Sequence, residues 1–81
     1  MYAVTHSNRS IICLFPSEEE ARDYLMQRAA RAALESFRDF RAVWLICTAP
    51  GAGGVVGGEI GRVVAERTGR TLSVTLTGPA A

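Results

Sequence analysis

The chain has 81 residues, of which 48% are hydrophobic and 21% charged, and its formal net charge is +1. This composition excludes a disordered chain, and the length fits one domain over residues 1–81. No apolar run approaches the roughly 20 residues of a membrane span, and no signal peptide is visible, so we expect a cytoplasmic protein with no membrane partner. All the basic residues are arginine, and the near-zero net charge does not favour direct nucleic-acid binding.

Residues 2–15 are expected to form a β-hairpin. Residues 2–6 alternate between apolar and polar, and residues 10–15 are β-branched and apolar. Ser7-Asn8 between them has turn chemistry, because asparagine tolerates the left-handed backbone conformation.

The spacing then predicts a helix from about 18 to 37. Ser17 is its expected N-cap, and Glu20 three residues later completes the pattern of a capping box. Three glutamates in the first turn suit the positive end of the helix dipole. The apolar stripe is mostly alanine, which lets the helix lie close on a sheet.

The second half of the chain predicts two strands, 43–48 and 71–77, separated by an ambiguous segment. Residues 59–69 fit a helical stripe through Ile60, Val63, Val64 and Arg67, and we favour a helix there; the alternative is a strand that turns at Thr68-Gly69 into the last strand. The expected fold is α+β, in the order β-β-α-β-α-β. It has a mostly antiparallel or mixed four-stranded sheet with the long helix on one face.

The glycine-rich segment 51–58 is the only candidate for a phosphate-binding loop. Its candidate residues are Gly51, Gly53, Gly54 and Gly57. The spacing Gly51-x-Gly53-x-x-x-Gly57 resembles the first turn of some nicotinamide-dependent reductases, but the acid that such enzymes carry at the end of the next strand is missing. The Walker A pattern fails because Glu59 occupies the position of its lysine. We therefore interpret the segment as a connection or binding loop, with nucleotide or cofactor-phosphate binding as the alternative.

No catalytic or metal-binding pattern is apparent elsewhere. His6 is the only histidine, and no spacing places a nucleophile or carboxylate beside it. Cys13 and Cys47 lie in apolar runs, which favours buried free thiols; a disulfide is the alternative. We expect neither an enzyme, nor a cofactor, nor a metal.

Two surfaces are candidates for binding another macromolecule. The runs 11–15 and 43–47 are apolar on both faces, so they need cover on both. We expect a patch around Trp44, Ile46 and one side of 11–15 to be completed by another chain. The exposed face of the helix is the second candidate, a charged docking surface. This face carries Glu18, Glu19, Arg22, Asp23, Arg28, Arg31, Glu35 and Arg38. The candidate binding residues on it are Glu19, Arg22, Asp23, Arg28 and Arg31.

In size and build the whole chain resembles the small inhibitors encoded by phages and mobile elements, including anti-CRISPR proteins. The resemblance implies a non-catalytic protein that binds a protein or nucleoprotein complex and blocks a surface of it. It differs from the acidic, DNA-mimicking type in its near-zero net charge. The function expected is therefore that of a small protein-binding module, and the alternatives are a phosphate-binding domain and a homo-oligomeric structural subunit, such as a homodimer.

Overall fold

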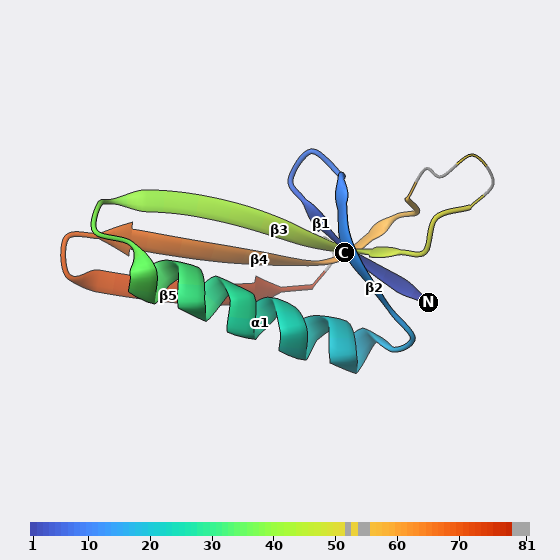
Figure 1. The fold of residues 1–81 in the computed structure, drawn as a ribbon, viewed down its shortest axis with the longest axis horizontal. Coiled ribbons are helices and arrows are strands. Elements are labelled where there is room, and N and C mark those ends of the chain that lie inside the picture. The colour runs from blue at the N-terminus through green and yellow to red at the C-terminus, as the bar shows by residue number, and fades with distance from the viewer. Residues whose placement is uncertain (52, 54–55, 79–81) are drawn as a thin grey trace.

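The computed structural model describes residues 1–51, 53 and 56–78, which form one α-helix and one antiparallel sheet (Figure 1). The spatial order of the five strands is β2-β1-β3-β4-β5. Within the described residues, no helix combines the length and the hydropathy needed to cross a membrane. The elements are β1 (Tyr2–His6), β2 (Ile11–Phe15), α1 (Glu18–Glu35), β3 (Phe40–Thr48), β4 (Glu59–Thr68) and β5 (Thr71–Thr77).

The expected α+β class and the long helix on one face are confirmed, but the predicted second helix is wrong. Residues 59–68 form β4, so the sheet has five strands and the order is β-β-α-β-β-β. β4 and β5 are joined by the two residues Gly69 and Arg70, and Gly69 has φ +62°. A positive φ at the first residue of a two-residue loop is typical of a type II′ hairpin turn. The glycine expected to cap a helix therefore turns a hairpin.

The predicted N-terminal hairpin is confirmed, although its left-handed residue is not the expected asparagine. Arg9 has φ +70°, and its amide donates to the His6 carbonyl at 2.9 Å. Asn8 instead accepts hydrogen bonds through its side-chain oxygen from the amide and hydroxyl of Ser10. This is a three-residue loop that ends in a left-handed residue, a position that glycine usually occupies.

Helix α1 begins where the capping box predicts and ends two residues before the predicted end. The Ser17 hydroxyl oxygen accepts from the Glu20 amide at 3.2 Å, and Ser36 leaves the helical conformation with ψ 134°. The buried side of the helix consists of Ala21, Leu25, Ala29 and Ala33. Because three of these four side chains are methyl groups, the helix backbone approaches the sheet closely.

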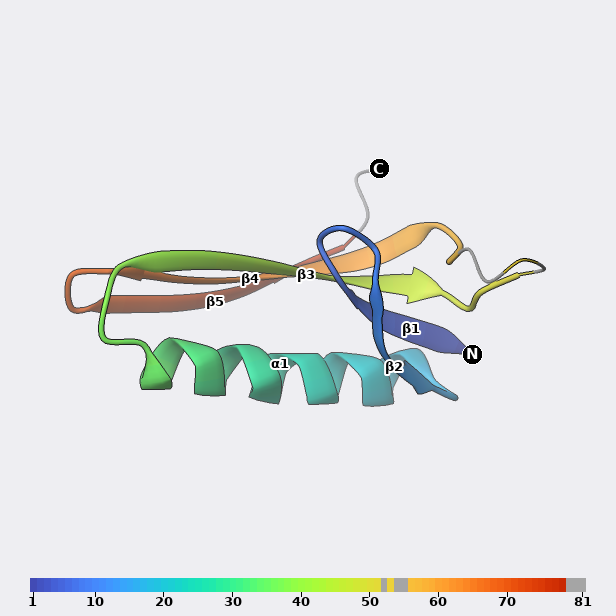
Figure 2. The same ribbon diagram turned by 45° about the horizontal axis from the view of Figure 1, so that its top comes forward.

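The sheet buries apolar side chains on both faces, as the apolar run 43–47 predicted, whereas the run 11–15 forms the edge strand β2, whose side chains are half-buried or exposed. The face under α1 holds the main core, which includes Val4, Trp44, Ile46 and Val63. The opposite face holds a smaller cluster of Ala3, Leu45, Cys47 and Val56. Figure 2 shows that α1 covers one face alone. The opposite cluster is closed instead by Val56, from the connection that precedes β4, rather than by a second helix.

Candidate protein-binding groove

An open groove of about 400 Å³ lies between one flank of α1 and β3. Trp44 lines it from the sheet; it is only 7% exposed, because most of its side chain belongs to the core under α1. The helix contributes the other lining residues, which are Tyr24, Gln27, Arg28, Arg31, Ala32 and Glu35. The groove therefore combines an aromatic side chain of the core with a polar, arginine-bearing wall.

Helical periodicity explains why these residues share one wall. Positions three and four apart lie on the same side of a helix, and Tyr24, Arg28 and Arg31 follow that spacing. An Arg28 guanidinium nitrogen donates to the Tyr24 hydroxyl at 3.0 Å, which fixes both side chains along the wall. Among the described residues, the ion pairs that involve arginine use Arg22, Arg41 and Arg62, so Arg28 and Arg31 form no ion pair there, although Glu35 lines the same wall.

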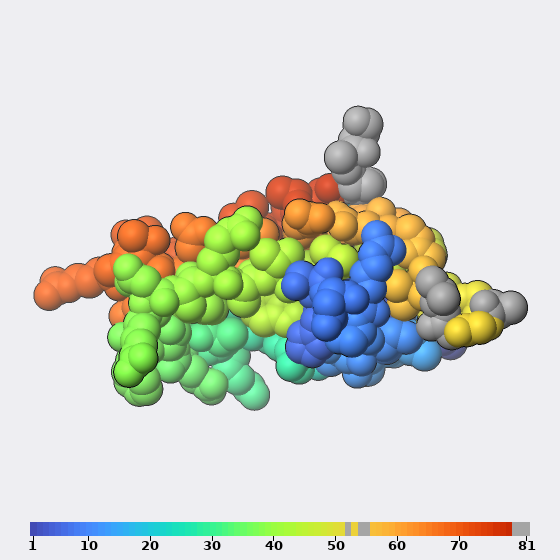
Figure 3. Space-filling view, turned by 90° about the horizontal axis from the view of Figure 1, so that it is seen from above, coloured from blue at the N-terminus to red at the C-terminus, as the bar shows by residue number. Residues whose placement is uncertain are grey.

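Beside the groove, half of β3 has an unpaired edge. β1 pairs with Trp44–Thr48 only, because β1 ends at His6 and the hairpin turns away. Residues 40–43 therefore have a neighbouring strand, β4, on one side only. In Figure 1 no other strand lies beyond this half of β3, and Figure 3 shows β3 at the surface beside the β1–β2 hairpin.

The hydrogen bonds at the strand ends show which backbone groups point to this edge. The Ala49 amide donates to the Met1 carbonyl on the β1 side, whereas Thr48 exchanges hydrogen bonds with Gly57 and Gly58 on the β4 side. Because the direction alternates along a strand, the N–H and C=O groups of Arg41 and Val43 point to the open edge. Two residues thus offer donors and acceptors to an added strand.

The structure brings together three of the residues predicted to bind a partner and separates the others. Trp44, Arg28 and Arg31 line the same groove. Glu19 and Asp23 are exposed outside it, and Arg22 forms an ion pair with Glu18 at 2.7 Å. The patch predicted around Ile46 is corrected: Ile46 is fully buried under α1, so this chain covers it itself.

Sequence reasoning missed Tyr24 and Gln27 as groove residues, and it missed the open edge of β3; Glu35 was placed on the charged face of the helix. The spacing of Tyr24, Arg28, Arg31 and Glu35 carried the signal for the helix wall, since these positions lie three or four residues apart. The open edge depends on which strand lies beside β3 and where that strand ends. Neither is readable from hydrophobic patterning.

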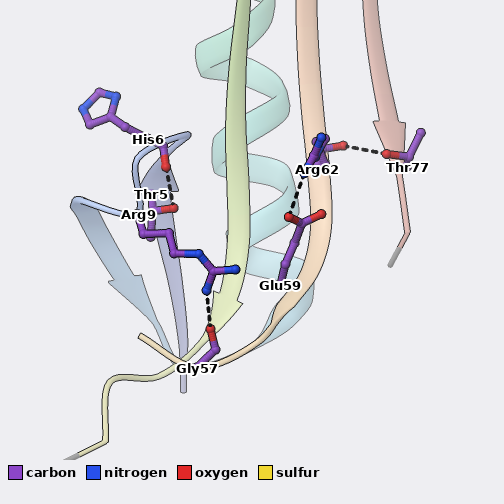
Figure 4. Close-up of polar contacts among 7 residues, drawn as sticks. All are labelled: Thr5, His6, Arg9, Gly57, Glu59, Arg62 and Thr77. Carbon is purple, nitrogen blue, oxygen red and sulfur yellow. Dashed lines mark hydrogen bonds and ion pairs between the residues drawn. The ribbon is translucent and has the colours of Figure 1, made fainter. Parts of the chain in front are cut away.

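The predicted glycine loop joins two antiparallel strands, and a strand rather than a helix follows it. Gly51 and Gly53 are exposed, while Gly54 lies outside the described residues. The Gly57 amide donates to the Thr48 carbonyl at 3.1 Å. Figure 4 shows the other contact, in which the Gly57 carbonyl accepts from the Arg9 guanidinium at 3.2 Å. The helix N-terminus that a phosphate loop uses is thus replaced by β4, and Glu59 at its start pairs with Arg62 at 3.0 Å.

The remaining candidate side chains lie apart from the groove. His6 is exposed and points away from its neighbours in Figure 4. Both cysteines are free: Cys13 is half-buried, and Cys47 is buried on the face opposite α1. Burial raises the pKa of the Cys47 thiol, and its hydrogen bond with Thr5 and the charge of Arg9 oppose this effect. In the described part of the chain, no three His, Cys, Asp or Glu side chains are grouped to hold a metal ion.

Comparisons with known proteins add no assignment: no protein family, curated protein or solved structure matches this chain significantly.

Proposed function

We propose that this chain is a protein-binding module that holds an extended segment of a partner against β3. The observation that carries the proposal is the juxtaposition of the groove with the open edge at Arg41 and Val43. An added strand on that edge forms main-chain hydrogen bonds, and alternate side chains of the strand enter the groove. This is recognition by β-strand addition.

The lining of the groove suits protein recognition. Trp, Tyr and Arg dominate the binding energy of protein interfaces, and the groove contains Trp44, Tyr24 and two arginines. The arginines also select the chemistry of the partner. A guanidinium binds a carboxylate through two parallel hydrogen bonds, so the preferred segment carries an Asp or Glu whose side chain faces Arg28 or Arg31.

Selection of peptides from a random display library, followed by fluorescence anisotropy, tests the proposal. Selected peptides should contain acidic residues, and Arg31→Glu should weaken their binding by tenfold or more, about 1.4 kcal/mol. Arg70→Glu is the matched control, because Arg70 is an exposed arginine in the β4–β5 turn; it should leave binding unchanged. Bound peptide should also slow hydrogen exchange at the amides of Arg41 and Val43. Equal effects of the two substitutions, or protection at another strand, would contradict the proposal.

An inhibitor that blocks a surface of a bacterial nucleoprotein complex is a narrower form of the same proposal. In that case the groove and the β3 edge bind an acidic extended segment of a protein subunit. The test is inhibition of a purified complex by the wild-type chain. Arg31→Glu should abolish the inhibition, and Arg70→Glu should not.

A further inference from the structure

Strand β5 is an edge strand without the features that usually protect such edges. It lies at the end of the sheet and pairs with β4 only, in an unbroken register. Its seven residues, Thr-Leu-Ser-Val-Thr-Leu-Thr, include no charge and no proline. Edge strands normally carry a charged residue, a proline or a bulge that prevents pairing with another chain. The opposite edge strand, β2, is shorter, and its pairing with β1 is irregular.

The sequence of β5 is nearly the same in both directions. When two copies lie antiparallel and Val74 faces Val74, Leu72 faces Leu76 and Thr71 faces Thr77. The last pair, Ser73 with Thr75, also joins two hydroxyl side chains. Each pair unites residues of one kind on one face of the sheet, and such cross-strand pairs are the unit of sheet stabilisation. A two-fold symmetric interface requires this self-complementarity.

The backbone of β5 has free groups at the matching positions. A two-residue hairpin loop is closed by a hydrogen-bonded pair, here Thr68 and Thr71. Alternation along the strand then directs the N–H and C=O groups of Leu72, Val74 and Leu76 away from β4. In the antiparallel pairing centred on Val74, these residues face one another, so every outward donor meets an acceptor.

An apolar cavity of about 220 Å³ lies on the same edge, between α1 and β5. Its lining includes Ala30, Ala33 and Leu34 from the helix and Leu72 and Val74 from the strand. Leu34 is 72% exposed and Leu72 is 39% exposed. In the symmetric pairing, Leu76 of the second copy lies opposite Leu72 and covers this cavity. A second copy of the chain would therefore both cover this exposed apolar surface and pair with the open edge of β5.

We propose that two copies of this chain associate through β5, which joins their two sheets into one continuous antiparallel sheet. The two-fold axis passes between the two Val74 residues, perpendicular to the sheet, so both α1 helices lie on one face. The C-terminal half of α1 packs beside β5, so the C-terminal halves of the two helices lie next to each other across the axis. The β3 groove is not part of this interface, and the inference does not depend on the proposed function.

Light scattering coupled to size exclusion, across a hundredfold range of concentration, tests the association. The wild-type chain should be a dimer that dissociates on dilution. Leu72→Arg should be monomeric at every concentration, because it places two charges opposite apolar side chains. The matched control is Leu14→Arg on β2, since Leu14 is 44% exposed at the opposite edge; this variant should remain a dimer. Cooperative thermal unfolding of each variant verifies that it is folded.

Cross-linking tests the register. Ser73→Cys and Thr75→Cys chains, each in a Cys13→Ala background, should form a mixed disulfide dimer when combined, because residues 73 and 75 face each other across the axis. Each variant alone should cross-link more slowly. A wild-type monomer at all concentrations would overturn the proposal. So would a dimer that Leu14→Arg dissociates and Leu72→Arg does not, or equal cross-linking in all three samples.

Discussion

Trp44 illustrates how a residue in an apolar run can serve both the core and the surface. Its side chain packs under α1, yet it also lines the groove with Arg28 and Arg31. The alternation rule indicates cover on both faces of the run, but it does not say whether the same chain or a partner provides it. Truncating Trp44 would therefore damage the core, and Arg31 is the better residue with which to examine binding.

The buried thiol of Cys47 predicts a loss of stability at alkaline pH. Burial raises its pKa above the ordinary value of 9.0 in the folded state, whereas the unfolded thiol titrates normally. The unfolded chain thus loses its proton first, so the free energy of unfolding is constant below the ordinary pKa and falls as the pH rises above it. Urea unfolding between pH 7 and pH 10 should show this fall. Cys47→Ala should flatten it, and an unchanged slope in that variant would contradict the assignment.

Gly57, just before β4, and Gly61, within β4, are predicted to respond oppositely to substitution by alanine. A Cβ at Gly61 would contact the Ile46 side chain at 3.6 Å, an ordinary packing distance, and the φ of Gly61 is not positive. Gly61→Ala should therefore stabilise the fold by about 0.4–1 kcal/mol. A Cβ at Gly57 would overlap the Thr48 side chain, so Gly57→Ala should destabilise it by about 1–3 kcal/mol. Chemical denaturation measures both, and equal signs would contradict the packing described.

At the scale of elements, the segments with local signals were predictable. The capping box placed the start of α1 correctly, and strict alternation identified β5, in which Val74 and Leu76 are half-buried while the hydroxyl residues are exposed. β4 was mispredicted because Ile60, Val63 and Val64 fit a helical stripe as well as a strand. Hydrogen-bonded pairing with β3 on one side and β5 on the other stabilises the strand conformation of residues 59–68. Such pairing depends on tertiary structure, which local patterns do not show.

The open edge of β3 predicts an alternating pattern of hydrogen exchange. The amide of Ala42 points to β4 and should exchange slowly, whereas those of Arg41 and Val43 point to the open edge and should exchange at least tenfold faster. Exchange measured by NMR on the free protein distinguishes these residues. Equal protection at all three positions would mean that another part of the molecule already covers the edge.

At the scale of the whole molecule, the two proposed surfaces use different edges. The groove lies beside β3, β5 is at the end of the sheet, and β4 separates them. A dimer through β5 therefore carries two grooves related by the two-fold axis. A partner with two acidic segments would then bind with an avidity that exceeds the affinity of either groove.

The position of β1 has a consequence for how the chain folds. β1 lies between β2 and β3, and Val4 faces Ile46, more than forty residues later in the sequence. The strands β3, β4 and β5, in contrast, follow one another and pair with their nearest neighbours in the chain. During synthesis, the N-terminal hairpin and α1 leave the ribosome before β3, the strand that pairs with β1. The barrier to folding therefore includes the entropy of closing the long loop between β1 and β3, whereas the β1–β2 hairpin and the β3–β4–β5 meander can each form by contacts between consecutive strands.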